Sequence, residues 1–312
     1  MGDSMQFTRR EFGRLALAGV PAAMLIDRPT LATGLVPAQT KPNSLVNGVQ
    51  LGAITYSYRS MPDQSAEAIL KYVVDSGVSA IEFMGAPVER FAGAPSGRGG
   101  AAETLRTWRA SASMEPFTRL RKMFNDAGVT IYAWKQLSPN MSDEEFEYIF
   151  NVAEALGCTH TTLELPGGPN AAAQLKRIGE FAAKKKIYAA YHTHLQGSIT
   201  AFDEAFSISP ANMANVDLGH YVAAGGDAME FLQKFHGRIA SFHLKDRTTP
   251  ANGARNLPWG TGNTPIREIL QLVKKNKWTM PASIELEYPV PQDSDAVKEV
   301  VKCLQFCREA LA

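Results

Sequence analysis

Eight short apolar runs recur along the chain from about residue 49, and each is followed by a segment with the spacing of an amphipathic helix. Runs that are hydrophobic almost throughout are typical of parallel strands covered on both faces. Eight strand–helix units close most economically into a single (β/α)8 TIM barrel, an α/β fold, with a doubly wound open sheet as the alternative. The runs are residues 51–58, 80–85, 130–136, 159–166, 187–194, 214–220, 239–246 and 282–288.

Several local signals mark the expected helix ends and loops. Ser142, followed three residues later by Glu145, is typical of a capping box, and Gly77, Gly128 and Gly157 follow helices where a left-handed residue is favoured. No Gly-x-Gly-x-x-Gly follows the first run and no P-loop occurs, which disfavours a nucleotide-binding open sheet. The segment 86–113 is rich in Gly, Ala, Pro and Arg and predicts a long irregular insertion over the barrel mouth, as a lid or a partner surface.

The N-terminus differs in composition from the rest of the chain. Arg9 and Arg10 precede an uncharged stretch at 15–26, and small residues follow up to Ala38. This order resembles the twin-arginine (Tat) signal of bacteria, and the apolar stretch is too short to be a stable membrane anchor. We therefore expect a signal peptide at 1–38, a barrel domain at 39–312, and a periplasmic or secreted protein.

Charge and cysteine content exclude several classes of protein. Lys and Arg total 32 against 31 for Asp and Glu, so the chain lacks the basic excess that nucleic-acid binding uses, and no nucleic-acid partner is expected. Cys158, Cys303 and Cys307 are expected to be buried thiols rather than a disulfide framework or a metal site. The sequence does not exclude an oligomer.

Histidines and acids gather at the carboxyl ends of the later predicted strands, where barrel enzymes carry their chemistry. Converging carboxylates repel one another unless a cation or protons neutralise them, and a mixture with imidazoles suits Mn²⁺, Zn²⁺, Co²⁺ or Fe²⁺ better than Mg²⁺. One divalent metal ion is therefore expected, although each residue alone could be a hydrogen-bonded loop residue. The residues are Glu164, His192, His194, Asp217, His220, His243, Asp246, Glu285 and Glu287.

Three segments carry a resemblance to a known family. Residues 216–220 (VDLGH), 238–246 (RIASFHLKD) and 283–287 (SIELE) resemble the xylose-isomerase-like TIM barrel superfamily of sugar phosphate isomerases and epimerases. That group holds ketose 3-epimerases, inosose isomerases and dehydratases, and barrel AP endonucleases. The resemblance implies that Asp217, His243 and Glu285 bind a divalent metal and that His220 contacts substrate.

The chain departs from the family pattern at residues 191–194 (YHTH). Epimerases of this family usually have a metal-binding Glu there that doubles as one of two catalytic bases. His192 is expected to replace it as a ligand, so a two-carboxylate epimerisation is in doubt and another base is needed. The catalytic candidates are Glu164, His194 and Glu287, and the substrate-binding candidates are His220, Lys245 and Trp259.

Glu164 is the first choice for the base, and it could instead supply another metal ligand or replace one of the four. It stands between Leu163 and Leu165, an apolar setting expected to raise its pKa toward neutrality. The alternative is a structural Glu164 paired with a nearby Lys or Arg.

The function expected from these residues is proton abstraction next to a carbonyl. The first choice is a metal-dependent isomerase or epimerase acting on a free or keto sugar, and the alternative is a 3-keto-glycoside lyase or hydratase that shares the first step. A non-catalytic sugar-binding barrel and an AP endonuclease are the less favoured interpretations.

Overall fold

The computed structural model describes residues 41–95, 101–194 and 196–312. The expected signal peptide at 1–38 lies outside the described residues. The elements below all belong to the unit that follows it.

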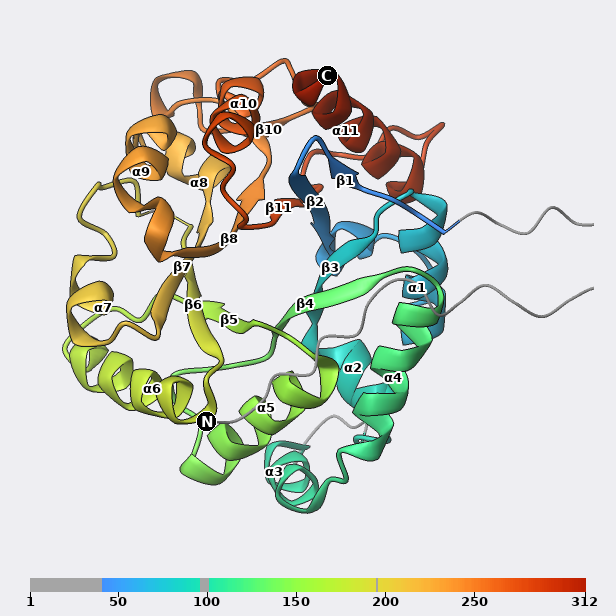
Figure 1. Ribbon diagram of the computed structural model, residues 1–312, viewed down its shortest axis with the longest axis vertical. Coiled ribbons are helices and arrows are strands. Elements are labelled where there is room, and N and C mark those ends of the chain that lie inside the picture. The colour runs from blue at the N-terminus through green and yellow to red at the C-terminus, as the bar shows by residue number, and fades with distance from the viewer. Residues whose placement is uncertain (1–40, 96–100, 195) are drawn as a thin grey trace, which may run out of the picture. The chain divides into compact units, whose positions relative to one another are not determined.

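Eight parallel strands form a closed barrel, which confirms the predicted fold (Figure 1). Hydrogen bonding runs in the order β2, β11, β8, β7, β6, β5, β4, β3, and β3 pairs back to β2. The barrel strands are β2 (Val49–Ile54), β3 (Ala80–Met84), β4 (Thr130–Lys135), β5 (His160–Glu164), β6 (Tyr188–His192), β7 (Asn212–Asp217), β8 (Ile239–Leu244) and β11 (Ala282–Ile284). The short β1 (Leu45–Val46) extends β2 as an antiparallel hairpin, and β9 (Asp246–Arg247) pairs with β10 (Asn256–Leu257) in the loop after β8.

Helices surround the barrel (Figure 1). The α-helices are α1 (Ala66–Asp75), α2 (Gly85–Phe91), α3 (Ala101–Ser111), α4 (Glu115–Asp126), α5 (Asp143–Leu156), α6 (Ala171–Lys185), α7 (Asp203–Ile208), α8 (Leu218–Ala223), α9 (Ala228–Phe235), α10 (Ile266–Asn276) and α11 (Ala296–Leu311). Three 3₁₀ turns accompany them at η1 (Thr55–Tyr58), η2 (His236–Arg238) and η3 (Pro250–Asn252). In the part of the chain that the structure describes, no helix is both long and apolar enough to cross a membrane.

The predicted helix ends are confirmed. At the start of α5, the Ser142 hydroxyl accepts a hydrogen bond from the Glu145 amide, and the Glu145 carboxylate accepts one from the Ser142 amide. Gly157 ends the same helix with φ +76°, a conformation that glycine adopts without steric cost. The first cap satisfies N–H groups and the second satisfies carbonyl oxygens that the ends of a helix leave unpaired.

Most of the core is a continuous apolar layer between the strands and the helices. Trp134 on β4 and Phe83 on β3 are fully buried in it. The three cysteines are buried free thiols, as expected.

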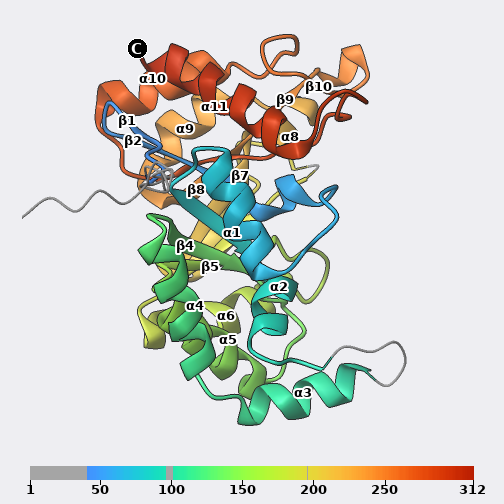
Figure 2. The same cartoon turned by 90° about the vertical axis from the view of Figure 1, so that its right-hand side faces the viewer.

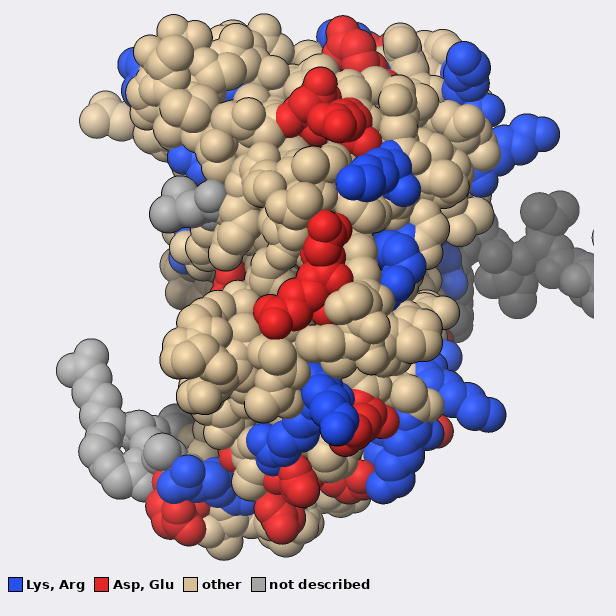
Figure 3. Space-filling view, turned by 90° about the vertical axis from the view of Figure 1, so that its left-hand side faces the viewer, with Lys and Arg blue, Asp and Glu red and all other residues tan. Residues whose placement is uncertain are grey.

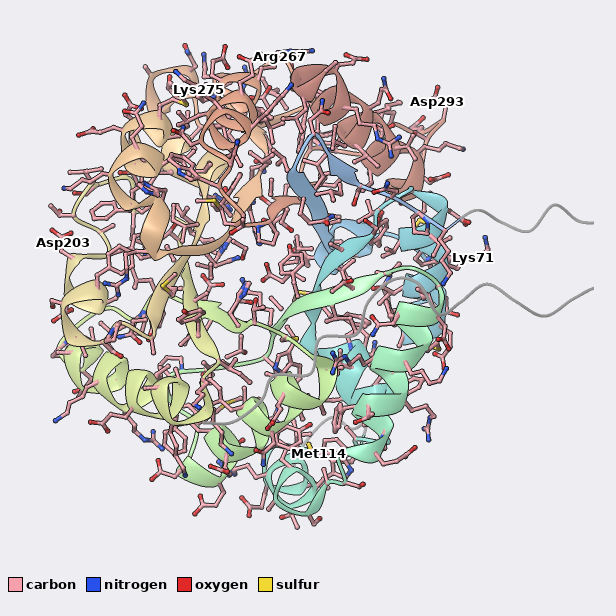
Figure 4. The ribbon with its side chains drawn as sticks, viewed as in Figure 1. Lys71, Met114, Asp203, Arg267, Lys275 and Asp293 are labelled. Carbon is pink, nitrogen blue, oxygen red and sulfur yellow. The ribbon has the colours of Figure 1, made fainter. Side chains whose placement is uncertain are left out.

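Polar side chains cover the outside: Lys71, Asp203, Arg267, Lys275 and Asp293 lie at the periphery in Figure 4. On the face shown in Figure 3, acidic and basic side chains are interspersed, and that face carries no continuous basic surface.

The described parts of the segment 86–113 are largely helical, so the predicted irregular insertion is wrong. Helices α2 and α3 occupy most of it, and α3 packs against α5 at the outer edge of the barrel (Figure 2). The buried Arg109 guanidinium binds Glu89 of α2 at 2.8 Å and Glu145 of α5 at 2.9 Å. These ion pairs fix α3 to the helix layer rather than over the barrel mouth.

Candidate metal centre and active site

Four side chains from neighbouring strands converge at the carboxyl end of the barrel. His192 ends β6, Asp217 ends β7, His243 lies in β8 and Glu285 directly follows β11. One ligand atom of each lies within 4.8 Å of those of the other three, and all four residues are buried. The structure therefore brings together the four residues expected to bind a metal.

Strand alternation explains this convergence, because side chains two residues apart on a strand point to the same face. Ser241, His243 and Lys245 form one such column along β8, and all three are buried. Ser283 of β11, with Glu285 and Glu287 in the segment that follows it, forms another. Each column rises from the barrel interior to the mouth, so the ligands have polar neighbours below and above them.

One carboxylate oxygen of Asp217 accepts a hydrogen bond, and the other accepts none. Oδ1 accepts a hydrogen bond from the His220 amide at 2.7 Å and so caps α8. Oδ2 is buried without a hydrogen-bond partner, although Lys245 Nζ lies 3.0 Å away as an ion pair. Burial raises the pKa of Asp217 to about 7 despite Lys245. A buried carboxylate oxygen that accepts no hydrogen bond is the kind of atom that a cation satisfies.

His243 is held between two carboxylates. Its Nε2 lies 2.7 Å from Glu82 Oε2, and its Nδ1 lies 2.7 Å from Glu285 Oε2. Burial opposes the charged ring, but Glu82 and Glu285 outweigh it and raise the pKa of His243 to about 10. When Nδ1 loses its proton to become a ligand, Nε2–H can still donate to Glu82, which is the usual arrangement of a metal-binding histidine.

His192 presents its other ring nitrogen. Its Nδ1 lies 3.2 Å from the Asn215 side-chain oxygen, and because that oxygen only accepts, we assign the proton to Nδ1. Burial, together with Lys135 and His243, holds the pKa of His192 well below its ordinary value, so the ring is neutral. Nε2 is then left with a lone pair for a ligand.

Glu82 is the main residue of the site that the sequence analysis missed. It is fully buried in β3 and accepts hydrogen bonds from Thr162 Oγ1 at 2.6 Å, Asn215 Nδ2 at 3.2 Å and His243 Nε2. Burial alone would raise the pKa of Glu82, but His243 lowers it to about 2. A single acid inside the apolar run AIEFM was the signal that could have identified it.

Lys245 carries the positive charge at the centre of the acidic cluster. Its ammonium lies 3.1 Å from Glu285 Oε2 and 2.7 Å from Glu287 Oε2, in addition to its contact with Asp217. Burial disfavours the charge, yet these carboxylates raise the pKa of Lys245 above its ordinary value. The lysine is therefore a fixed hydrogen-bond donor at the mouth.

Glu164 does not have the apolar setting expected for it. Its side chain is 52% exposed, and Oε1 lies 2.8 Å from Lys135 Nζ. The expected apolar setting is wrong because Glu164 ends β5 with an exposed side chain, and of its two leucine neighbours only Leu163 is buried. Glu164 does lie beside His192 in the sheet register, and its Oε2 is 3.6 Å from His194 Nε2.

The remaining candidates lie at different distances from the cluster. His220 Nε2 lies 2.9 Å from Lys245 Nζ and 3.7 Å from Glu287 Oε2. His220 and Glu287 therefore both border the ligands, because Lys245 also contacts Asp217 and Glu285. Burial, with Lys245 and Arg247, lowers the pKa of His220 to about 2, and its ring is neutral. Trp259 instead packs edge-on against Phe306 of α11, at a ring distance of 6.1 Å, and the contacts described for it do not link it to the ligands.

A second group of possible ligands shares one residue with the first. His192, His194 and His220 also have ring nitrogens within 4.8 Å of one another. His192 has only one free nitrogen, however, and Lys245 and Arg247 both contact His220. Lys245 borders both groups, but the first group supplies two carboxylates that offset its charge. The second group has no carboxylate and also has Arg247 against His220, so the first group is the better cation site.

The donor set also indicates which metal would fit. Two imidazole nitrogens and two carboxylate oxygens suit Zn²⁺, Mn²⁺, Fe²⁺ or Co²⁺, while Mg²⁺ prefers oxygen ligands and water. The Asp217 oxygen that accepts no hydrogen bond and the two oriented imidazoles agree with such an ion.

Comparison with known proteins agrees with this architecture. The family model described as "Xylose isomerase-like TIM barrel" matches residues 70–307. The chain belongs to this family. A curated relative, the inosose dehydratase of Clostridium botulinum (strain Eklund 17B / Type B), is 25% identical over 156 residues, which is 43% of this chain and 52% of that protein. The chain thus spans about half the length of this relative.

Solved structures resemble the chain over most of its length. The probable 3-DHS dehydratase AsbF from Bacillus anthracis superposes with a TM-score of 0.62 at 16% identity, covering 82% of this chain and 98% of that one. The IolI protein with a bound zinc atom has a TM-score of 0.61 at 14% identity, covering 84% and 98%. At these identities the likeness establishes the fold.

Proposed function

We propose that this protein is a metal-dependent enzyme that removes a proton next to the carbonyl of a keto sugar or keto-polyol and then expels a β-leaving group. The ligand set carries this proposal: His192 stands where a second carboxylate would serve a two-base epimerisation. Elimination needs a base on one side of the substrate only. The dehydratase name of the curated relative supports the same reaction class.

The metal would be held by His192, Asp217, His243 and Glu285. When bound, a divalent ion polarises the substrate carbonyl and stabilises the negative charge that develops on its oxygen. Lys245, buried and protonated beside two of these ligands, is placed to donate a hydrogen bond to a neighbouring substrate hydroxyl.

Glu164 is the proposed base. It accepts the proton from the carbon next to the carbonyl, the C–H electron pair forms the C=C bond, and the bond from the β-carbon to the leaving oxygen breaks. The leaving oxygen takes a proton from Glu164 or from the adjacent His194 and departs as water or an alcohol. No oxidant or reductant is required.

Isomerisation or epimerisation is a second candidate, which one observation favours. Glu164 ends β5 and Glu287 follows β11, so these two carboxylates lie at the two ends of the run of neighbouring strands β5, β6, β7, β8 and β11. Such a pair could remove a proton on one side and return it on the other.

Product analysis separates the candidates. The protein loaded with Zn²⁺ or Mn²⁺ is incubated with free ketoses, inososes and 3-keto-glycosides in D₂O, and products are read by NMR. Elimination yields an unsaturated ketone and a free alcohol or water, whereas isomerisation releases no leaving group and gives an isomer that has exchanged hydrogen for deuterium. A non-catalytic sugar-binding barrel would bind without exchange, and an AP endonuclease would instead cleave abasic DNA; either result would overturn the proposal.

We also propose export by the Tat route with removal of residues 1–38. The twin arginines and the short apolar stretch support it. Mass spectrometry of protein isolated from its native host should find a mature chain that begins near Gln39 in the periplasm or the medium. An intact N-terminus on cytosolic protein would refute export.

A further inference from the structure

We infer that Glu82 and Asn215 form one clamp that sets which ring nitrogen His192 and His243 present to the metal. The inference rests on the proposed metal centre and adds two positioning residues to it. Both residues are fully buried: Asn215 lies on β7, between the ligand strands β6 and β8, and Glu82 lies on β3, outside the ligand strands.

The clamp is a continuous chain of hydrogen bonds between the two imidazoles. His192 Nδ1 donates to Asn215 Oδ1 at 3.2 Å, and Asn215 Nδ2 donates to Glu82 Oε2 at 3.2 Å. The same Glu82 oxygen accepts from His243 Nε2 at 2.7 Å. One amide and one carboxylate thus connect the outer nitrogens of both histidines.

The chemistry of these groups allows one proton arrangement only. A carboxylate accepts and does not donate, so the Asn215 nitrogen must face Glu82 and its oxygen must face His192. His192 is then protonated on Nδ1 and offers Nε2, whereas His243 keeps its proton on Nε2 and offers Nδ1. The two rings therefore direct different nitrogens, Nε2 of His192 and Nδ1 of His243, toward the proposed metal position.

Neighbouring residues hold the clamp in place. Thr162 Oγ1 donates to the second Glu82 oxygen at 2.6 Å, and Asn215 Nδ2 also donates to Ser241 Oγ at 2.7 Å. Ser241 is in turn 2.8 Å from His160 Nε2. These contacts leave neither the carboxylate nor the amide free to rotate, which a role in orienting ligands requires.

The test compares Glu82→Ala, Glu82→Gln and Asn215→Ala with the natural protein. Loss of an outer partner should weaken metal binding about 10- to 100-fold, measured by competition with a chelator. Glu82→Gln should recover part of the loss, because its amide oxygen can accept from His243 while its nitrogen faces the Thr162 hydroxyl. The Glu82→Ala/Asn215→Ala double variant should lose less than the product of the single effects, because the two residues touch.

Nitrogen NMR reports the tautomers of the histidine rings, and these would not change if Glu82 and Asn215 only stabilised the fold. Asn215→Ala should let His192 populate both tautomers, and Glu82→Ala should expose the His243 Nε2 proton to rapid exchange. Ser283→Ala is the control, because Ser283 is equally buried and its hydroxyl pairs with Tyr132 rather than with the clamp. It should leave affinity and tautomers unchanged.

Three outcomes are distinguishable. Weaker metal binding with altered tautomers in the clamp variants supports the inference, and the same affinity and tautomers as in Ser283→Ala overturn it while leaving the metal proposal intact. If the natural protein binds no divalent metal, the proposed function fails, and the His192 tautomer in the metal-free Asn215→Ala variant still decides whether the clamp exists.

Discussion

Lys245 Nζ lies 3.0 Å from Asp217 Oδ2, close enough to neutralise a carboxylate that the metal centre also needs. The same ammonium lies 3.1 Å from Glu285, the other carboxylate of the group. Lys245 therefore stabilises the metal-free site but opposes the charge of an incoming ion.

Lys245→Met should raise metal affinity by at least about tenfold, because it removes a unit charge a few ångströms from the ion in a poorly solvated site. Turnover should fall, since the donor at the mouth is lost. Chelator competition measures the affinity, and Lys234→Met, at an exposed lysine of α9, is the control. Weaker metal binding in Lys245→Met would show that the ammonium supports the ligands instead of competing with the ion.

Metal affinity should rise with pH. Asp217 has a pKa near 7 and His243 a pKa near 10 in the metal-free protein, so the ion must displace protons to bind. Between pH 7 and 9 one proton, from His243, is displaced, and the dissociation constant should fall about tenfold per pH unit. Below pH 7 the slope should steepen as Asp217 also becomes protonated. Dissociation constants measured from pH 6 to pH 9 that do not change would contradict this competition.

Glu164→Gln should keep its metal and lose turnover by a factor of about 10² to 10⁴, as expected when a general base is removed. Elemental analysis measures whether the metal is kept, and steady-state kinetics measure the loss of turnover. Glu147→Gln, which also removes a partly exposed carboxylate paired with lysines, should leave turnover unchanged. Near-full turnover in Glu164→Gln would make Glu164 a structural partner of Lys135 and leave His194 or Glu287 as the base.

Arg109→Met should destabilise the fold by about 3–5 kcal/mol, because the carboxylates of Glu89 and Glu145 would be left buried without their cation. Arg106→Met removes an exposed arginine paired with Glu103 and should change the free energy of unfolding by no more than about 0.5 kcal/mol. Urea unfolding curves measure both. Equal shifts in the two variants would mean that the buried ion pairs contribute little.

The barrel and its ligand positions could be predicted from the sequence for a physical reason. Buried parallel strands produce apolar runs, and a strand's last inward side chains must lie at the mouth, which placed the histidines and acids there as a group. The family resemblance then selected Asp217, His243 and Glu285 as ligands, and the departure at 191–194 added His192. The helix α3 was missed because Gly and Pro near residues 93–100 dominate the composition of its segment, although residues 101–111 themselves favour a helix.

Partners from distant strands were not predictable in the same way. Glu82 lies 161 residues from His243 in the chain, and no local pattern connects them. The exposure of Glu164 depends on how far the mouth opens around β5, which the apolar neighbours Leu163 and Leu165 do not reveal. Lys135 ends β4, and the direct pairing of β4 with β5 places it beside Glu164, a contact that the apolar pattern of the two runs does not reveal.

The most direct test is proton exchange in D₂O. The metal-loaded protein is incubated with keto sugars, inososes and 3-keto-glycosides, and the proton next to the carbonyl is followed by NMR. The proposed chemistry predicts metal-dependent exchange or elimination with at least one of these substrates. His243→Ala should lose both the metal and the exchange, while His236→Ala, at an exposed histidine stacked on Trp278, should retain both. Metal binding without exchange for any substrate, or exchange that survives in His243→Ala, would contradict it.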